Sequence, residues 1–196
     1  NLVPEDALFM FVFRSPVAHA ELKGLDFGIA RAADGVHLVL GFDDLVAAGV
    51  HAGLDSTLVD NLDGSKGAAP FRPMLANKRV RFVGEAIAVI IAESSFQARD
   101  AAELIECDYD ELPVHLSIEP GGETIHPEAP ENLAFNWGIG DANSTQTAFD
   151  QAAHRIELEV VDNRIIVNTI EPRGCYAEWK DNRLHVCVNG QGVWGV

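Results

Sequence analysis

The sequence has few cysteines, few basic residues and no long apolar run. Its three cysteines, Cys107, Cys175 and Cys187, form no C-x-x-C pair, and no signal-like apolar stretch precedes them, so a reducing cytoplasm fits best. Only 14 lysines and arginines accompany 30 aspartates and glutamates, and the net charge of −16 disfavours nucleic acid and anionic membrane surfaces as partners. The longest strongly apolar run, residues 86–92, is much shorter than the ~18 residues of a membrane span. The sequence therefore indicates a cytoplasmic protein without a membrane span.

What remains is the composition of a globular protein. Hydrophobic residues make up 47% of the chain and charged residues 22%, which suits a buried core and excludes a disordered acidic tail. A length of 196 residues suffices for one large domain, or for one domain and part of another. Because the chain stops at Val196 directly after a strand-like segment, we expect it to be a fragment of a longer polypeptide.

The clearest secondary structure lies in residues 79–113. The run AIAVIIA at residues 86–92 is rich in β-branched side chains and predicts a central strand buried on both faces. Ser94 and Gln97 have the spacing of a capping box, and alanines at helical spacing follow them. Apolar and acidic residues then alternate over 105–110 until a proline, as in a strand with one face in water. The stretch therefore predicts a strand, a helix and a second strand.

The rest of the chain predicts an α+β protein. Proline and glycine in residues 119–132 exclude a helix or an interior strand there, which indicates a linker between domains. Residues 49–77 predict a long irregular connection, of a kind that is often functional, disordered or packed on a neighbour. The other predictions are strands at 8–13, 18–25, 36–40 and 155–161, short helices at 26–33, 41–48 and 147–154, and a hairpin of 175–179 and 184–188 that turns at Asp181-Asn182.

Chemical motifs are sparse. Residues 190–195 spell G-x-G-x-x-G, but a dinucleotide site also needs a buried parallel strand before it and a helix after it. None of the seven histidines has a partner at metal-ligand spacing, and no serine lies in a G-x-S-x-G turn. The residues alone therefore assemble no active site and leave two alternatives open: a non-catalytic α+β interaction module and, less favoured, a dinucleotide-binding protein.

Four separated motifs resemble the molybdenum-binding large subunit of the xanthine dehydrogenase, aldehyde oxidase and carbon monoxide dehydrogenase family. Residues 14–20, RSPVAHA, are similar to that subunit's R-S-P-x-A-H-A opening. Residues 81–85 with the strand after them are similar to its V-G-E-x-x-A-V segment, and residues 102–106 with 108–109 and 112–113 are similar to its A-E-L-I-E-V-D-Y-x-x-L-P segment. Residues 171–174 with Gln191 resemble its E-P-R-G and the glutamine-bearing turn beyond. The motifs occur in the family's order along essentially the whole chain.

The resemblance implies an α/β hammerhead domain with a mixed sheet at residues 1–120, a linker at 121–132, and the incomplete start of a molybdopterin-binding domain at 133–196. It implies a molybdenum hydroxylase, with carbon monoxide, an aldehyde or a heterocycle as substrate. The cofactor would be molybdopterin, and the partners an FAD-binding medium subunit and an iron–sulfur small subunit. Gln191 corresponds to the glutamine near the cofactor, whereas no catalytic residue and no metal ligand falls within these 196 residues. The chain alone is therefore expected to be inactive and to bind no cofactor.

Overall fold

The computed structural model describes residues 4–55, 59–163, 165, 169–172 and 174–190. The chain divides into two compact units, which are considered separately. The first comprises residues 6–140 and contains both hydrophobic cores of the described residues. The second comprises the described residues of 141–196 together with residues 4–5. No helix among the described residues has both the length and the apolar character that crossing a membrane requires.

One sheet of the first unit is built around β7 (Ala86–Ala92), with β1 (Phe9–Arg14) and β3 (Val36–Leu40) as antiparallel neighbours on its two sides. The prediction of a central strand at residues 86–92 is confirmed with the same bounds. Ile87 and Ile90 are 1% and 0% exposed and belong to different core clusters. β7 is therefore buried on both faces, as its continuous apolar run predicts.

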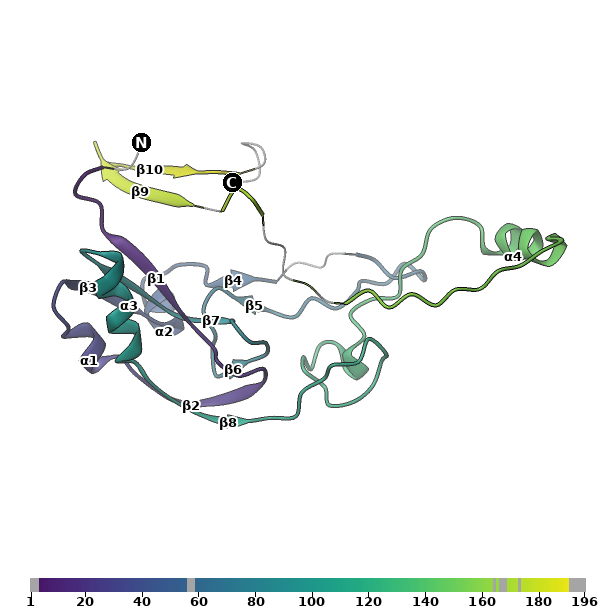
Figure 1. The fold of residues 1–196 in the computed structure, drawn as a ribbon, viewed down its shortest axis with the longest axis horizontal. Helices are drawn as coiled ribbons and strands as arrows, with labels where there is room; N and C mark the ends of the chain where they lie inside the picture. Colours follow the sequence, from purple (N-terminus) through teal and green to yellow (C-terminus); the bar gives the residue numbers. More distant parts are fainter. Residues whose placement is uncertain (1–3, 56–58, 164, 166–168, 173, 191–196) are drawn as a thin grey trace. The chain divides into compact units, whose positions relative to one another are not determined.

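Helix α3 (Ser95–Glu103) packs on β1 and β7 and closes the larger core (Figure 1). Its alanines face the sheet, since Ala98, Ala101 and Ala102 are at most 4% exposed. The short helices α1 (Gly28–Arg31) and α2 (Phe42–Ala47) pack along β3. Small side chains on α3 let the helix approach the sheet closely, so the core forms with few large residues.

The other three-stranded sheet of the first unit has β2 (Ala20–Asp26) at its centre, between β6 (Arg79–Val80) and β8 (Glu106–Glu111). A smaller core of Ala20, Ala76, Val80 and Ile87 lies on it. The strand, helix and strand predicted in residues 79–113 all form, but β7 and β8 belong to different sheets. All strand pairs among the described residues are antiparallel, so the α+β class is confirmed and the expected mixed sheet is corrected. Neither three-stranded sheet is mixed, because the central strands β7 and β2 each have antiparallel partners on both sides.

The long irregular connection contains β4 (Gly53–Leu54), β5 (Arg72–Pro73) and a bridge between Asp60 and Lys66. Part of it packs against residues 133–138 of the same unit. The backbone N of Ala68 donates to the carbonyl oxygen of Ala134 at 2.7 Å, and the N of Leu62 donates to the carbonyl oxygen of Asn136 at 2.8 Å. The neighbour of this connection is therefore a later part of the same chain.

The second unit has helix α4 (Ala142–Gln151) and a hairpin of β9 (Cys175–Lys180) and β10 (Arg183–Val188). The hairpin is confirmed, and Asp181 and Asn182 both have positive φ, 53° and 58°, as a two-residue turn of this twist requires. The helix predicted at 147–154 instead begins earlier, because the Asp141 side chain accepts a hydrogen bond from the Ser144 backbone N.

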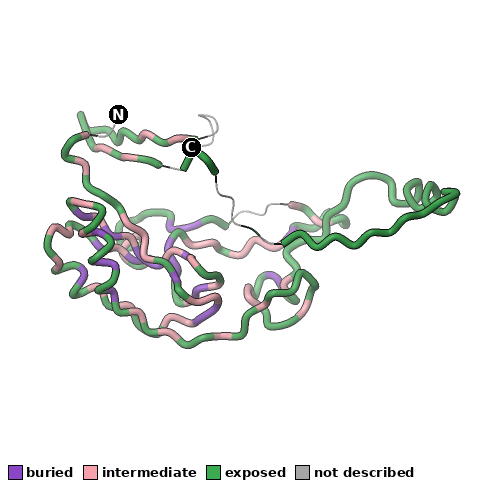
Figure 2. Tube along the Cα trace, viewed as in Figure 1, coloured by how far each residue is buried: buried purple, intermediate pink, exposed green. Residues whose placement is uncertain are grey.

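The strand predicted at 155–161 is wrong. These residues form no strand in the structure, and the apolar members of the alternation are exposed, Ile156 at 93% and Leu158 at 81%. A strand requires a neighbour that takes up its backbone hydrogen bonds, and no described segment pairs with this one. Figure 2 shows the same contrast: buried residues gather in the sheets and α3 of the first unit, whereas the second unit is almost entirely exposed.

Candidate functional site

Two of the family-like motifs are joined by their backbones. Ser15 N donates to the carbonyl oxygen of Glu85 at 2.8 Å, and Gly84 N donates to the carbonyl oxygen of Ser15 at 2.8 Å. The Arg14 guanidinium adds a bond of 2.9 Å to the carbonyl oxygen of Gly84. Gly84 has φ of 88°, a conformation that glycine adopts without strain. The R-S-P and V-G-E segments thus form one fixed corner beside β1 and β7.

His19, from the same R-S-P-x-A-H-A motif, is 3% exposed. Its Nδ1 lies 2.6 Å from the carbonyl oxygen of Pro113. A carbonyl oxygen can only accept, so Nδ1 carries the proton, and a neutral His19 presents its Nε2 lone pair. Nε2 is buried and has no hydrogen-bond partner among the described residues. The first motif and the L-P motif after β8 therefore meet at a histidine with one unused acceptor.

Further titratable side chains, linked to one another, lie in the same unit as His19. The Glu85 side chain is 8% exposed, and its Oε2 accepts a hydrogen bond from the Arg81 backbone N at 2.5 Å. Burial raises the pKa of the Glu85 carboxyl, and burial likewise lowers the pKa of the Arg81 guanidinium. The pKa of His126 is lowered by burial first and by the positive charge of Arg81 second. The charge of Glu128 acts in the opposite direction and raises this pKa, and His19 lowers it slightly further. These five residues, His19, Arg81, Glu85, His126 and Glu128, are called the His19–His126 cluster below.

His126 reaches the cluster from the segment predicted as a linker, which in the structure is a closed loop containing the 3-10 turn η1 (Pro130–Asn132). The Asn132 amide donates to the carbonyl oxygens of Gly121 at 2.9 Å and Glu123 at 2.8 Å, and its Oδ1 accepts from Ile125 N at 2.9 Å. The Gly121 backbone N also donates to the carbonyl oxygen of Glu131 at 2.7 Å. This Asn132 loop, residues 121–132, is therefore a compact loop with adjoining ends.

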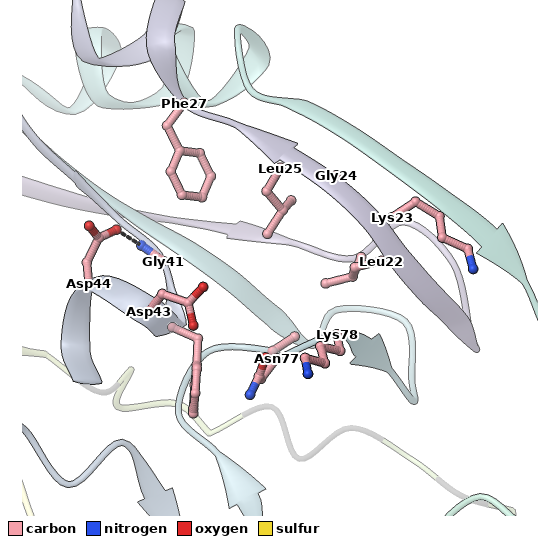
Figure 3. Close-up of a pocket in the computed structure, with 12 residues that line it drawn as sticks. Leu22, Lys23, Gly24, Leu25, Phe27, Gly41, Asp43, Asp44, Asn77 and Lys78 are labelled. Atoms are coloured by element: carbon pink, nitrogen blue, oxygen red, sulfur yellow. Dashed lines mark hydrogen bonds between the residues drawn. The ribbon is translucent and has the colours of Figure 1, made fainter. Parts of the chain in front are cut away.

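A hollow of about 460 Å³ lies elsewhere on the first unit, between β2, the start of α2 and residues 76–78 (Figure 3). Leu22, Leu25 and Phe27 form its apolar part, and Asp43 and Lys78 stand at its rim. Lys78 is the centre of a tight turn in which Arg79 N donates to the carbonyl oxygen of Asn77 at 2.7 Å. Its φ of 63° makes this a strained γ-turn. With both signs of charge at its rim, the hollow does not select one charge class of ligand.

Gln191, the predicted cofactor contact, lies outside the described residues, as do the other positions of 191–196. The strand that leads to it is described. The Asn189 side chain accepts a hydrogen bond from Gly174 N at 2.7 Å and donates to the carbonyl oxygen of Pro172 at 2.8 Å. The E-P-R-G segment is thus fastened to the end of the β9–β10 hairpin. Asn189 therefore ties the E-P-R-G segment to the last residues of β10.

Other chemistry is not assembled. The described residues contain no group of three or more histidine, cysteine or acidic side chains that could hold a metal ion. Cys107, Cys175 and Cys187 are free thiols, and burial raises the pKa of the Cys107 thiol. The strand before Gly190 is the exposed partner in an antiparallel hairpin, whereas a dinucleotide fingerprint follows a buried parallel strand. The hairpin therefore does not support dinucleotide binding.

The sequence patterns did not indicate the His19–His126 cluster or the Asn132 loop. The members of the cluster come from three separated segments, and no spacing rule connects them. One signal was available for the loop: Asn132 follows a proline-rich stretch, and asparagine is enriched at positive φ, here 58°. That signal locates a turn but not the partners of its side chain.

Comparison with known proteins identifies the class of the chain. Residues 2–113 match the family model of the aldehyde oxidase and xanthine dehydrogenase a/b hammerhead domain, and residues 125–196 match that of the molybdopterin cofactor-binding domain. The chain belongs to the aldehyde oxidase and xanthine dehydrogenase family. Its sequence is that of a molybdenum-hydroxylase large subunit over these two regions.

Individual relatives agree with this assignment. The chain is 33% identical to the nicotine 6-hydroxylase large subunit of Paenarthrobacter nicotinovorans and 30% identical to the carbon monoxide dehydrogenase large chain of Hydrogenophaga pseudoflava, over 91% and 88% of its own length. It spans 22% of the length of each. The solved carbon monoxide dehydrogenase of Oligotropha carboxidovorans has 29% identity and a TM-score of 0.60, covering 78% of this chain and 20% of that one.

Proposed function

We propose that this chain is the N-terminal part of the large subunit of a molybdenum hydroxylase that resembles carbon monoxide dehydrogenase. The observation that carries the proposal is the occurrence of both family matches, in order, on one chain. The substrate would be carbon monoxide, an aldehyde or a heterocycle. The two relatives named above, a nicotine 6-hydroxylase and a carbon monoxide dehydrogenase, support this range.

The division of labour within the chain is part of the proposal. Residues 1–120 would be the hammerhead domain, 121–132 the connection, and 133–196 the start of the cofactor-binding domain. When bound, molybdopterin supplies the redox-active molybdenum at which the substrate is oxidised. The chain's own contribution would be Gln191, whose amide can donate to one polar group and accept from another. The bonds of the Asn189 side chain to Pro172 and Gly174, on the segment before β9, would fix the backbone from which Gln191 extends.

Partners and location follow from the same assignment. We propose that electrons leave the large subunit for an iron–sulfur subunit and an FAD-binding subunit, in a cytoplasmic complex. The net charge of −16 agrees with a small-molecule substrate and with no nucleic-acid partner.

The test uses the full-length large subunit produced together with its neighbouring subunits. We expect stoichiometric molybdenum by elemental analysis, and oxidation of carbon monoxide, nicotine or an aldehyde coupled to a dye. The 196-residue chain produced alone should hold no molybdenum. A full-length complex that lacks molybdenum and oxidises none of these substrates would overturn the proposal.

Gln191 is tested in that complex by Gln191→Ala, with Gln151→Ala on the exposed face of α4 as the matched control. Loss of a hydrogen bond to a charged partner, about 1.5 to 3 kcal/mol, predicts a fall in kcat/KM of roughly 10- to 100-fold. The control should retain full activity. Equal activity of the two variants would remove Gln191 from the site without affecting the assignment to the family.

A further inference from the structure

One face of the β9–β10 hairpin consists only of apolar side chains. In the pairing of the two strands, Trp179 lies opposite Leu184, and Ala177 lies opposite Val186. Directly opposed residues share a face of a hairpin, and every second residue along each strand returns to that face. Six residues therefore form what is called the apolar hairpin face below: Cys175, Ala177, Trp179, Leu184, Val186 and Val188.

This face is the more exposed side of the hairpin. All six of its residues are exposed, with Trp179 at 69% and Leu184 at 62%. On the opposite face, Tyr176, Glu178 and Cys187 are half-buried. An antiparallel sheet in a complete domain has the reverse distribution, because its apolar face is the one turned to the core. A two-stranded hairpin by itself is also only marginally stable in water, so the apolar hairpin face requires a cover.

The second unit as a whole has the same character. None of its described residues is buried, whereas both hydrophobic cores of the described residues belong to the first unit (Figure 2). The alternating segment 155–161 also exposes its apolar side chains, Ile156 at 93% and Leu158 at 81%. A domain is built from layers packed around one hydrophobic core. The second unit is therefore one part of a domain, and its described residues do not supply the core.

We propose that the apolar hairpin face packs on the part of the large subunit that lies outside these 196 residues, and that this contact completes the core of the cofactor-binding domain. The inference rests on the proposed function, which makes the chain a part of such a subunit. Residues 125–196, which include the hairpin, match the cofactor-binding domain. The chain spans 22% of the length of each of the two relatives named above. Most of the length of such a subunit can therefore contribute the cover.

Charge and composition favour this occupant over a second copy of the chain or a separate subunit. The net charge of the chain is −16, so two copies that meet at this face would repel each other. Interfaces between separate electron-transfer proteins are small, and the rim of such an interface is polar. The apolar hairpin face instead has six apolar residues and no charged one. A face of this composition resembles half of a domain core, as in permanent contacts.

Cys175 is a probe of the cover, because it is a free and exposed thiol on the apolar hairpin face. Its alkylation by N-ethylmaleimide is followed by mass spectrometry of the peptide that contains it, in the 196-residue chain and in the full-length complex. We expect the thiol to react about tenfold or more slowly in the complex, because a covered thiol reacts only when the contact opens. In urea the two preparations should react at the same rate, which controls for the chemistry of the thiol.

Photo-cross-linking in the same complex identifies the cover. Val186, in the middle of the apolar hairpin face, is replaced by p-benzoylphenylalanine, and the same replacement of His185, on the opposite face, is the matched control. We expect position 186 to cross-link to peptides of the large subunit outside residues 1–196, and position 185 not to give the same cross-links. Leu184, nearer the turn on the apolar face, is the second position if the replacement of Val186 prevents assembly.

The outcomes separate this inference from the proposed function. The inference is overturned if Cys175 reacts equally fast in the complex and in the 196-residue chain. It is also overturned if the cross-links from the apolar face lead to another subunit or to a second copy of the large subunit. Molybdenum content and dye-coupled oxidation are measured on the same preparation. An active molybdenum enzyme with a freely reactive Cys175 refutes the covered face alone, whereas a slowly reacting Cys175 in a complex without molybdenum or activity supports the cover and refutes the proposed function.

Discussion

Asn132 offers the sharpest test of the structure, because the side chain of this single partly exposed residue closes a loop of twelve residues. Its side chain makes three hydrogen bonds, to Gly121, Glu123 and Ile125. Its backbone has φ of 58°, in the left-handed region. Two substitutions separate these contributions. Asn132→Gly removes the bonds and keeps the backbone free to adopt this φ, whereas Asn132→Ala removes the bonds and also disfavours the φ.

The magnitudes follow from these contacts. Three hydrogen bonds at about 1 kcal/mol each set an upper value, and the partial exposure of Asn132 reduces the expected loss in Asn132→Gly to about 2 kcal/mol. A left-handed φ costs an ordinary L-residue about 1 to 2 kcal/mol, so Asn132→Ala should lose about 3 kcal/mol. These are free energies of local loop opening. The global free energy of unfolding should change less, because the two hydrophobic cores lie outside the loop.

The assay is hydrogen exchange at the Ile125 and Gly121 amides, with urea unfolding as the global measure. At about 1.4 kcal/mol per factor of ten, protection at Ile125 should fall roughly 30-fold in Asn132→Gly and more than 100-fold in Asn132→Ala. Glu131→Gly is the matched control, since Glu131 also has positive φ, 55°, and no side-chain hydrogen bond among the described contacts. It should leave protection unchanged or raise it. Native protection in Asn132→Gly would refute the role of the side chain.

Three further substitutions test other parts of the first unit. Ser94→Ala should lower the free energy of unfolding by about 1 kcal/mol, because the Ser94 hydroxyl accepts a hydrogen bond from Gln97 N at the start of α3. The control Ser95→Ala, at an exposed serine, should change this free energy little. Lys78→Gly should exceed Lys78→Ala in stability by about 1 kcal/mol in urea unfolding, because only glycine relieves the positive φ of the γ-turn. Burial raises the pKa of Glu85 in the folded protein. Its favourable contribution to the free energy of unfolding is therefore present at low pH and is lost as the pH rises through the pKa of the folded state. The stability of the native chain relative to Glu85→Gln should therefore decrease from about pH 4.5 to about pH 7.5, and a constant difference would contradict the burial of this carboxyl.

Local signals in the sequence are sufficient to predict a helix, strand or turn wherever that element depends on residues a few positions away in the sequence. The apolar run of β7, the Ser94 cap of α3 and the Asp181-Asn182 turn each act within a few residues. The same is true of the bounds of β3, whose five residues agree with the prediction. Each element could be predicted because any other conformation of the same residues would lose the helix cap, or would expose the apolar side chains that the element buries.

Prediction failed where the outcome depends on partners far along the chain. The alternation of residues 155–161 is that of a strand, but a strand forms only with a partner, and none pairs with it in the described structure. The segment 121–132 was predicted as a linker from its prolines and glycines, and the boundaries of the two domains remain predictions. Composition correctly excluded a helix over most of this segment, but it cannot show that the Asn132 side chain closes the loop.

Three of the four family-like motifs form structural contacts within the first unit. Ser15 bonds to Glu85, His19 bonds to Pro113, and the buried Glu85 accepts from Arg81. The described residues contain no group of side chains that could hold a metal ion, so these contacts are not parts of one. Their burial suits a role in holding the segments around the two sheets in register, because a buried polar group is stable only when its partners are fixed.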